Sequence, residues 1–207
     1  YCRALSGFWD LRSTVRITRP FYGARPFAVA HGPVHPRTGK SLQNVPMPKK
    51  SASTPATKAL NAAEIDFMVH QYNPADQTAG WGAEAAEALG LDPNRVFKTL
   101  MIRLDDRLCV AIVPVSGSLD LKAAAKALGA KKAELADKAL AQRVTGYVLG
   151  GISPLGQRKT HQTVLDESAL EFPTIFVSGG KRGMDLDLDP IDLIRVIQAV
   201  TAQIRTR

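Results

Sequence analysis

Lys98 occupies a position where a charged side chain needs an explanation. It lies in the segment VFKTLMI, residues 96–102, in which most other side chains are apolar. An unpaired charge inside a protein is costly, so one interpretation is that the ammonium points into a cleft and meets a phosphate or a developing oxyanion. The alternative is a lysine on the solvent-facing side of a strand, which alternation along a strand permits. The pattern by itself favours neither interpretation.

A glycine-rich segment, GGISPLG at residues 150–156, follows an apolar stretch. Gly150 and Gly151 have no side chains, so their backbone amides can approach a ligand closely and form an oxyanion pocket. The segment is not the nucleophile elbow GxSxG, because two residues separate Ser153 from Gly156. A turn that only reverses the chain is an equally good interpretation.

A second glycine-rich segment, SGGKRG at residues 178–183, also follows an apolar stretch. Its flexible backbone and its two cations, Lys181 and Arg182, suit it to holding phosphate groups. The Walker spacing GxxxxGK[ST] is absent, so the sequence does not support nucleoside triphosphate hydrolysis. Taken alone, this segment is slightly better interpreted as an ordinary charged hairpin turn.

Other catalytic arrangements find little support in the sequence. After residue 50 it contains only the histidines His70 and His161, and no serine or cysteine has a recognisable base beside it in a familiar motif. Both histidines are interpreted as structural. The HExxH pattern and clustered carboxylate ligands are missing, so we predict no metal site. The alternating acids Asp185, Asp187 and Asp189 are predicted to share one face of a strand at a solvated sheet edge.

The net charge of +8 comes from one region of the chain. The first fifty residues contain nine basic side chains and one acid, whereas the other residues contain eighteen of each sign. Charge is therefore weak evidence for nucleic-acid binding by the rest of the chain. Residues 1–50 are predicted to be a disordered extension or upstream sequence wrongly joined to the gene, in preference to a functional arm or a targeting peptide.

The composition predicts one globular domain that does not span a membrane. A chain of 207 residues with 45% hydrophobic content fits a single domain, and no apolar run approaches the roughly eighteen residues that cross a bilayer. Cys2 and Cys109 lie far apart and belong to no CxxC pair, which favours a reducing cytoplasm. We expect Cys109 to be a small buried core residue.

Hydrophobic periodicity, caps and turn residues predict alternating helices and strands. Helices are expected at residues 55–64, 82–89, 120–128 and 131–143 and from Pro190 through Val200, and strands at residues 67–72, 97–104, 108–115, 147–149, 163–165, 174–177 and 184–188. The two strands at 97–115 are expected to form a hairpin. This order predicts an α/β fold, a single compact domain with a mixed sheet flanked by helices.

Four separated motifs together resemble a known family. They are TPA at residues 54–56, DPNRVFKTL at 92–100, TGYVLGGISPLG at 145–156 and VSGGKRG at 177–183. In this order and spacing they resemble the YbaK/EbsC family, and within it the bacterial Cys-tRNA(Pro) deacylases related to the editing domain of prolyl-tRNA synthetases. The resemblance covers about residues 53–204. It implies a barrel-like mixed sheet, no metal or cofactor, and hydrolysis of the ester between an amino acid and the tRNA 3′ end.

The resemblance also implies roles for particular residues. Family members are thought to let the thiol of the substrate cysteine attack its own carbonyl, which releases a cyclic thiolactone without an enzyme nucleophile. The residues implied are Lys98, Gly150 and Gly151 for catalysis, Tyr72, Ser153, Ser178, Gly179 and Gly180 for substrate binding, and Lys181 and Arg182 for tRNA contact.

The expected partners are mischarged tRNA(Pro) and prolyl-tRNA synthetase, with the protein monomeric and cytoplasmic. Three other functions stay open at this point. The first is an Ala-tRNA(Pro) deacylase, which needs an activated water because alanine has no thiol. The others are a non-catalytic tRNA- or nucleotide-binding module and a general phosphate-binding protein.

Overall fold

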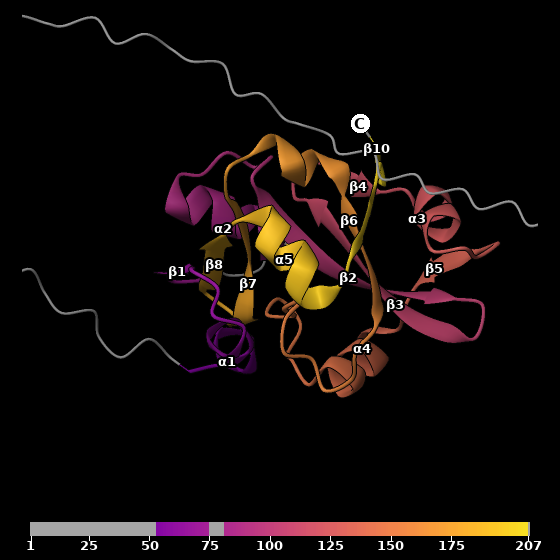
Figure 1. The fold of residues 1–207 in the computed structure, drawn as a ribbon, viewed down its shortest axis with the longest axis horizontal. Coiled ribbons are helices and arrows are strands. Elements are labelled where there is room, and N and C mark those ends of the chain that lie inside the picture. The colour runs from indigo at the N-terminus through magenta and orange to yellow at the C-terminus, as the bar shows by residue number, and fades with distance from the viewer. Residues whose placement is uncertain (1–52, 75–80, 207) are drawn as a thin grey trace, which may run out of the picture. The chain divides into compact units, whose positions relative to one another are not determined.

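The computed structural model describes residues 53–74 and 81–206 of the chain. Residues 1–50, predicted to be an extension, lie outside this part. The described residues form helices packed around one large sheet (Figure 1).

The large sheet is mixed. Its strands, in spatial order, are β1 (Met68–Gln71), β8 (Met184–Leu188), β7 (Ile175–Lys181), β2 (Val96–Leu104), β3 (Arg107–Pro114), β6 (Gln162–Asp166) and β9 (Val200–Ala202), while β5 (Ala133–Leu135) pairs with β2 beside this path. The pairs β2/β7, β3/β6 and β6/β9 are parallel and the others antiparallel. A small ladder joins β4 (Ser118–Leu119) to β10 (Arg205–Thr206). The predicted α/β fold and the β2–β3 hairpin are confirmed, and the described ladder is an open path that stops short of a closed barrel.

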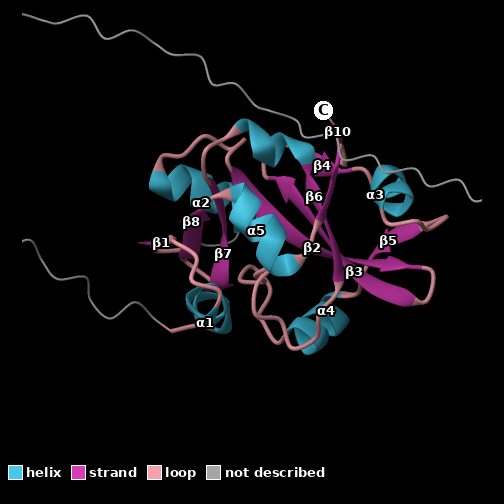
Figure 2. Cartoon of the chain, in the orientation of Figure 1, coloured by secondary structure: helices cyan, strands magenta, loops and turns pink. Residues whose placement is uncertain are grey.

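Helices cover both faces of the sheet (Figure 2). The core on one face includes residues of α1 (Pro55–Ala62), α4 (Lys138–Thr145) and α5 (Pro190–Ile197). On the other face, α2 (Trp81–Leu89) and α3 (Leu121–Ala127) pack over separate apolar clusters. Alternate residues of β3 enter the two cores: Val110 and Ile112 face one, Cys109 and Ala111 the other. Cys109 is fully buried, as predicted.

Local capping signals fix the ends of several helices. Thr54 caps α1 through a capping box with Thr57, and Pro55 occupies the first helical position. Asp120 accepts hydrogen bonds from the first turn of α3, and Gly146 ends α4 in the left-handed conformation. These caps lie where the sequence predicted them. A short 3₁₀ helix, η1 (Glu167–Glu171), follows β6.

The helix predicted at residues 131–143 is wrong in its first half. Residues Ala133–Leu135 form β5, which pairs with β2, and α4 begins only at Lys138 after its cap, Asp137. Lys, Ala and Glu are good helix formers, so the local pattern predicted one helix. Pairing with a free stretch of β2 overrides that local preference.

Two further predictions fail at irregular segments. Residues 147–149 form no strand, and the Tyr147 hydroxyl instead donates a hydrogen bond to the Leu155 carbonyl at 2.7 Å, which folds this segment onto itself. The last helix ends at Ile197, and its C-cap Gln198 adopts the left-handed conformation, so Val200 begins β9 and not a further helical turn.

The solvated edge predicted for the alternating acids is also wrong. Strand β8 is an interior strand, paired with β1 on one side and β7 on the other. Asp185 is buried, with 6% of its surface exposed, and Asp189 lies beyond the strand as the cap of α5. Alternation placed Asp185 and Asp187 on one face correctly, but only the sheet order decides whether that face meets solvent.

Candidate functional site

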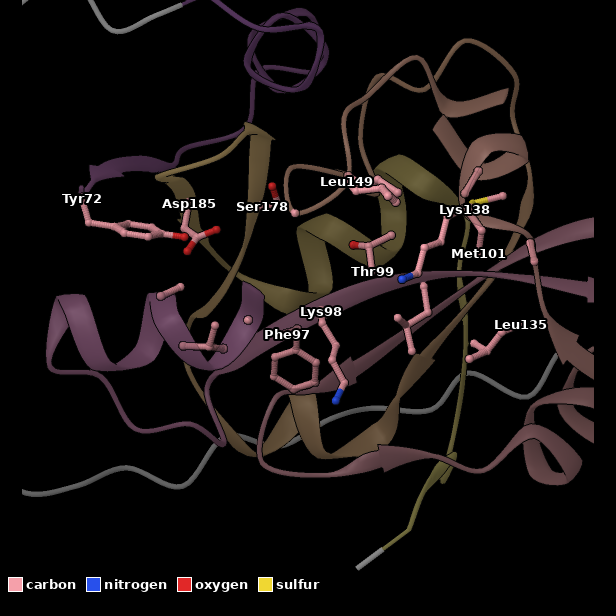
Figure 3. Close-up of a pocket in the computed structure, with 18 residues that line it drawn as sticks. Tyr72, Phe97, Lys98, Thr99, Met101, Leu135, Lys138, Leu149, Ser178 and Asp185 are labelled. Carbon is pink, nitrogen blue, oxygen red and sulfur yellow. The ribbon is translucent and has the colours of Figure 1, made fainter. Parts of the chain in front are cut away.

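One cavity of about 390 Å³ gathers residues from most of the separated motifs (Figure 3). Residues from α2, β2, β5, α4, β7 and β8 and from the loop after α4 line it. The lining includes Tyr72, Gly82, Lys98, Thr99, Leu100, Met101, Leu135, Lys138, Leu149, Gly150, Ile152, Ser178 and Asp185.

One end of the cavity is polar. Ser178 and Asp185 are register partners on the neighbouring strands β7 and β8. Tyr72 follows β1, where its backbone amide donates a hydrogen bond to the Gly183 carbonyl at 3.0 Å. Figure 3 shows the Tyr72 hydroxyl directed toward the Asp185 carboxyl group. Three elements therefore bring a phenol, a hydroxyl and a carboxyl group to one end of the cavity.

Asp185 dominates the electrostatics of this end. Its Oδ2 is buried and has no hydrogen-bond partner among the described residues. Burial raises the pKa of its carboxyl group to about 6, so the group is mostly ionised at neutral pH. The pKa of Tyr72 is also raised, first by burial and then by the charges of Asp185 and Glu84, which keeps its hydroxyl protonated and able to donate. A bound cation would satisfy this buried carboxylate.

Lys98 lies on the cavity and not on a solvent-facing strand surface. It is half-buried in β2, and burial lowers the pKa of its ammonium. Its Nζ donates a hydrogen bond to the Gly117 carbonyl at 2.7 Å. The start of α2 packs tightly beside it, since a Cβ added to Gly82 would lie 2.5 Å from Cγ1 of Val115 and 3.6 Å from the Cβ of Lys98. Of the two sequence interpretations, the structure favours the cleft, with the ammonium held by a backbone carbonyl.

The two glycine segments pack against each other. Gly150 lines the cavity and has a positive φ of 78°. A Cβ on Gly151 would lie 2.8 Å from the Lys181 carbonyl carbon, and a Cβ on Gly180 would lie 2.7 Å from the Tyr147 ring. Gly179 contributes its carbonyl, which accepts a hydrogen bond from the Thr54 hydroxyl at 2.6 Å. Gly151 and Gly180 therefore allow the loop and the β7–β8 hairpin to approach closely, and the Gly179 carbonyl joins this hairpin to the start of α1.

Several predicted site residues lie outside the cavity lining. Ser153 is fully buried, and its hydroxyl accepts a hydrogen bond from the Leu155 amide at 3.2 Å. Lys181 and Arg182 are exposed at the β7–β8 turn. The structure thus brings Tyr72, Lys98, Gly150 and Ser178 together around the cavity and places Gly151, Ser153, Gly179, Gly180, Lys181 and Arg182 outside its lining.

Two charged residues of the cavity, Asp185 and Lys138, were not predicted from the sequence as site residues. Asp185 gave a signal, because an acid alternating within the apolar strand MDLDL has the same ambiguity as Lys98, but it was interpreted as a solvated residue. Lys138 gave none, since it resembles an ordinary surface lysine of a helix. In residues 53–74 and 81–206, no group of three or more potential metal ligands lies together. No helix in the same ranges is long and apolar enough to cross a bilayer.

Comparison with known proteins identifies the family. The family model described as the aminoacyl-tRNA editing domain matches residues 76–196, more than half of the chain. A candidate Cys-tRNA(Pro)/Cys-tRNA(Cys) deacylase of Enterococcus faecalis, EbsC, is 40% identical over 123 residues, covering 59% of this chain and 75% of EbsC. A proline–tRNA ligase of Desulforamulus reducens is 26% identical over 164 residues, and the chain covers 28% of that ligase.

A solved structure agrees with the fold. It is described as a candidate trans-editing enzyme for prolyl-tRNA synthetase and superimposes with a TM-score of 0.64 at 23% identity, covering 76% of this chain and 100% of that one. The sequence matches and this structural similarity agree on the same family. The chain belongs to the aminoacyl-tRNA editing domain family.

Proposed function

We propose that this protein is an aminoacyl-tRNA deacylase that removes cysteine from mischarged Cys-tRNA(Pro). The observation that carries the proposal is that one cavity is lined both by the lysine Lys98 and by a buried carboxylate, Asp185, whose Oδ2 has no hydrogen-bond partner within residues 53–74 and 81–206. An aminoacyl ester brings an α-ammonium group close to a carbonyl that becomes an oxyanion during cleavage. A cavity with an anion and a cation on different walls is complementary to both charges.

Different residues of the cavity contact different groups of the substrate. The Asp185 carboxylate forms an ion pair with the α-ammonium group of the substrate, and the protonated Tyr72 hydroxyl donates a hydrogen bond to a polar atom of the aminoacyl group. The backbone at Gly150 approaches the ester without an intervening side chain. Lys98 stabilises negative charge on the carbonyl or a nearby phosphate, after its ammonium exchanges the Gly117 carbonyl for the substrate.

The chemical step that fits these residues uses the substrate thiol as the nucleophile. No histidine or cysteine is among the described residues that line the cavity, although Ser178 and Thr99 are. The thiol sulfur bonds to the carbonyl carbon, the bond from that carbon to the ribose oxygen breaks, and the thiol proton passes to the ribose oxygen. Holding thiol and carbonyl in contact can lower the barrier by up to roughly 7 to 11 kcal/mol. The products are a cyclic thiolactone and tRNA with a free hydroxyl.

The similarity to a segment of a proline–tRNA ligase supports prolyl-tRNA synthetase as the source of the mischarged tRNA and as a working partner. The match of the editing-domain model to residues 76–196 supports a deacylase domain that we extend to residues 53–204. In that arrangement the exposed Lys181 and Arg182 contact the tRNA backbone.

The test is the initial rate of deacylation of Cys-tRNA(Pro), Ala-tRNA(Pro) and Pro-tRNA(Pro) by the full chain. We expect rapid loss of cysteine only. Lys98→Met should lower kcat/KM by about 100-fold or more, the usual effect of removing a donor to a developing oxyanion. The matched control, Lys122→Met, removes an exposed lysine of α3 outside the cavity and should leave the rate unchanged.

Two results would overturn this function in different ways. Equal loss of alanine and cysteine would assign the cavity to an Ala-tRNA(Pro) deacylase that activates water. Tight binding of all three tRNAs without any turnover would indicate a non-catalytic binding module.

A further inference from the structure

Buried polar atoms without a partner are concentrated in one part of the protein. Within residues 53–74 and 81–206, five buried side-chain atoms have no hydrogen-bond partner: Nε2 of His70, Oε1 of Glu84, Oγ1 of Thr99, Oδ2 of Asp185 and Oδ1 of Asp187. Four of the five belong to the paired strands β1 and β8 and to the helix α2. Buried polar groups are nearly always hydrogen-bonded, so this concentration needs an explanation.

Two of these residues have neighbours that account for them. The Asp187 carboxylate lies 4.0 Å from Nη2 of Arg95 and 3.9 Å from Nε2 of His70. The His70 ring packs edge-on against Phe176, with the ring centroids 5.1 Å apart. Protein groups therefore surround His70 and Asp187.

Glu84 and Asp185 differ from this pair, because neither carboxylate forms an ion pair with a cation in the part of the chain that the structure describes. Asp185 lines the cavity and is already assigned to the substrate by the proposed function. Glu84 has no assigned role. Its buried, unpartnered Oε1 therefore remains to be explained.

Glu84 lies beside the polar end of the cavity. On α2 it stands between Gly82 and Ala85, which both line the cavity. The charges of Asp185 and then Glu84 raise the pKa of the Tyr72 phenol, after the larger effect of burial, so both carboxylates lie close to one hydroxyl. The helix dipole favours an acid in the first turn of α2, but an exposed carboxylate would gain this benefit without burying Oε1.

Two neighbouring carboxylates need a positive partner. Like charges repel at short distance, and burial strengthens that repulsion. The described residues contain no group of three or more potential metal ligands, so a metal ion fits poorly. An ammonium group fits well, because it has three N–H donors and no acceptor. The unpartnered oxygens of Glu84 and Asp185 and the hydroxyl of Ser178, the register partner of Asp185, offer three acceptors.

We propose that Glu84 and Asp185 together form a site for the unsubstituted α-ammonium group of the aminoacyl ester, so that the enzyme rejects N-acylated esters, including peptidyl-tRNA. This inference rests on the proposed function and adds Glu84 and a substrate class to it. An acylated nitrogen is uncharged and keeps one N–H, and its acyl oxygen presents an acceptor to two carboxylates. The α-nitrogen takes no part in the attack of the thiol on the ester. Selectivity for a free amino group therefore comes from the ammonium site and not from the chemical step.

The first experiment measures binding and needs no deacylase activity. The full chain is titrated with cysteamine and with N-acetylcysteamine at pH 7.5 and followed by NMR. Both probes carry the thiol, but only cysteamine carries an ammonium group. Charge-assisted hydrogen bonds predict that cysteamine binds roughly tenfold or more tightly than N-acetylcysteamine.

A matched pair of variants on α2 assigns the contribution of Glu84. Glu84→Gln should weaken cysteamine binding roughly fivefold to tenfold and leave N-acetylcysteamine binding unchanged. Glu87→Gln makes the same charge change at an exposed residue of the same helix and should leave both affinities unchanged. Thermal unfolding of Glu84→Gln should show no loss of stability, because the variant removes a buried carboxylate oxygen that has no partner among the described residues.

The second experiment measures turnover of Cys-tRNA(Pro) and N-acetyl-Cys-tRNA(Pro), each corrected for its uncatalysed loss in buffer. The wild type should cleave the acetylated ester with a kcat/KM roughly 100-fold lower, because both carboxylate contacts are lost. Glu84→Gln should lower kcat/KM for Cys-tRNA(Pro) roughly tenfold and leave the value for the acetylated ester unchanged. General damage to the fold would lower both values together.

The ammonium site and the deacylase function fail in distinguishable ways. If both esters are cleaved equally well, or if Glu84→Gln and Glu87→Gln weaken cysteamine binding equally, the ammonium site is wrong and the deacylase stands. If the preference for cysteamine depends on Glu84 but no aminoacyl-tRNA is cleaved, the ammonium site stands and the deacylase is wrong.

Discussion

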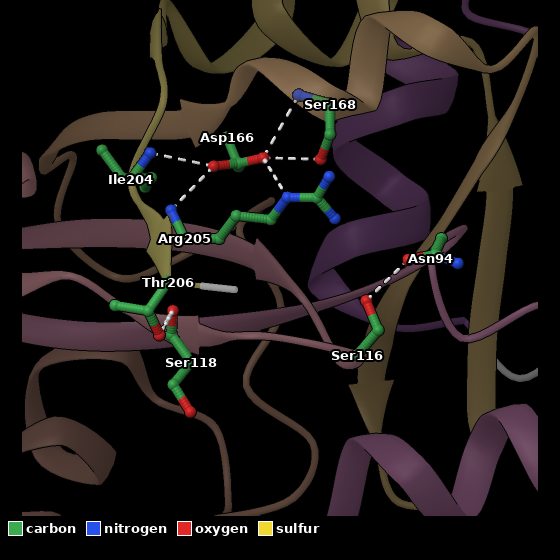
Figure 4. A network of polar contacts seen from close by, with 8 residues as sticks. All are labelled: Asn94, Ser116, Ser118, Asp166, Ser168, Ile204, Arg205 and Thr206. Atoms are coloured by element: carbon green, nitrogen blue, oxygen red, sulfur yellow. Dashed lines mark hydrogen bonds and ion pairs between the residues drawn. The ribbon is translucent and has the colours of Figure 1, made fainter.

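Two buried aspartates, Asp166 and Asp185, differ in how their charges are satisfied. Asp166 is 1% exposed and stands at the end of β6. Its carboxylate accepts hydrogen bonds from the amide and hydroxyl of Ser168 and from the amides of Ile204 and Arg205, and the Arg205 Nε lies 3.8 Å away (Figure 4). This network ties the C-terminal segment to the sheet.

Asp185 is almost as buried, but its Oδ2 has no hydrogen-bond partner in the part of the chain that the structure describes, and the residue lines the cavity. The folded protein therefore retains a desolvated carboxylate, and its pKa of about 6 reflects that penalty. Buried polar groups are nearly always hydrogen-bonded, so an exception that lines a cavity indicates a ligand site. Burial alone therefore does not distinguish a structural aspartate from one that binds a ligand, whereas the number of hydrogen bonds that its carboxylate accepts does.

The largest effect on stability is expected from replacing Asp166, the aspartate whose carboxylate is fully hydrogen-bonded. Asp166→Ala should lower the free energy of unfolding by roughly 3 to 5 kcal/mol, because it leaves the amides of Ile204 and Arg205 buried or part-buried without an acceptor. Urea unfolding monitored by circular dichroism measures this change. The folded fraction should keep its kcat/KM, and a loss below about 1 kcal/mol would contradict the structural role.

Replacing Asp185, whose Oδ2 has no hydrogen-bond partner among the described residues, is expected to raise stability where replacing Asp166 lowers it. Since the folded-state pKa of Asp185 is raised, the folded state binds the proton more tightly, and the protein loses stability as pH rises from about 4 to about 6. Asp185→Asn removes the penalty, so the variant should be more stable than the wild type by up to roughly 3 kcal/mol above pH 7 and equally stable near pH 4.

The same variant should lose most of its deacylase activity, because the amide cannot neutralise the substrate ammonium. Urea unfolding at pH 4 and pH 7.5, with kcat/KM at pH 7.5, makes the test. A variant that is destabilised at pH 7.5 would mean that Asp185 has a structural partner and that its contrast with Asp166 is false.

The smallest effects are expected at the two serines beside these acids. Ser168→Ala removes a hydroxyl that donates to Asp166 and should lower stability by roughly 1 to 2 kcal/mol without changing kcat/KM. Ser178→Ala, beside Asp185, should change stability by less than about 0.5 kcal/mol and lower kcat/KM several-fold. Thermal unfolding and steady-state kinetics on both variants would show a loss of stability in Ser168→Ala and a loss of kcat/KM in Ser178→Ala. Equal losses of stability in the two variants would contradict the contrast between the two aspartates.

Local signals predicted the parts of the fold that depend on neighbouring residues. The hydroxyl and proline at Thr54 and Pro55, the cap at Asp120 and the apolar runs of β2 and β3 each act within a few residues, and their elements form where expected. The segments that failed, at residues 131–143 and 147–149, take their conformation from distant partners, namely β2 and the Leu155 carbonyl.

The sequence by itself determined the family motifs, the mixed α/β architecture and four members of the cavity, Tyr72, Lys98, Gly150 and Ser178. Only the tertiary structure decided that Asp185 is buried, that Lys138 faces the cavity and that Lys98 is held by Gly117. The physical reason is that burial, cavity shape and hydrogen-bond partners arise from pairing between segments far apart in the chain. Periodicity assigns a side chain to a face, but it cannot say what covers that face.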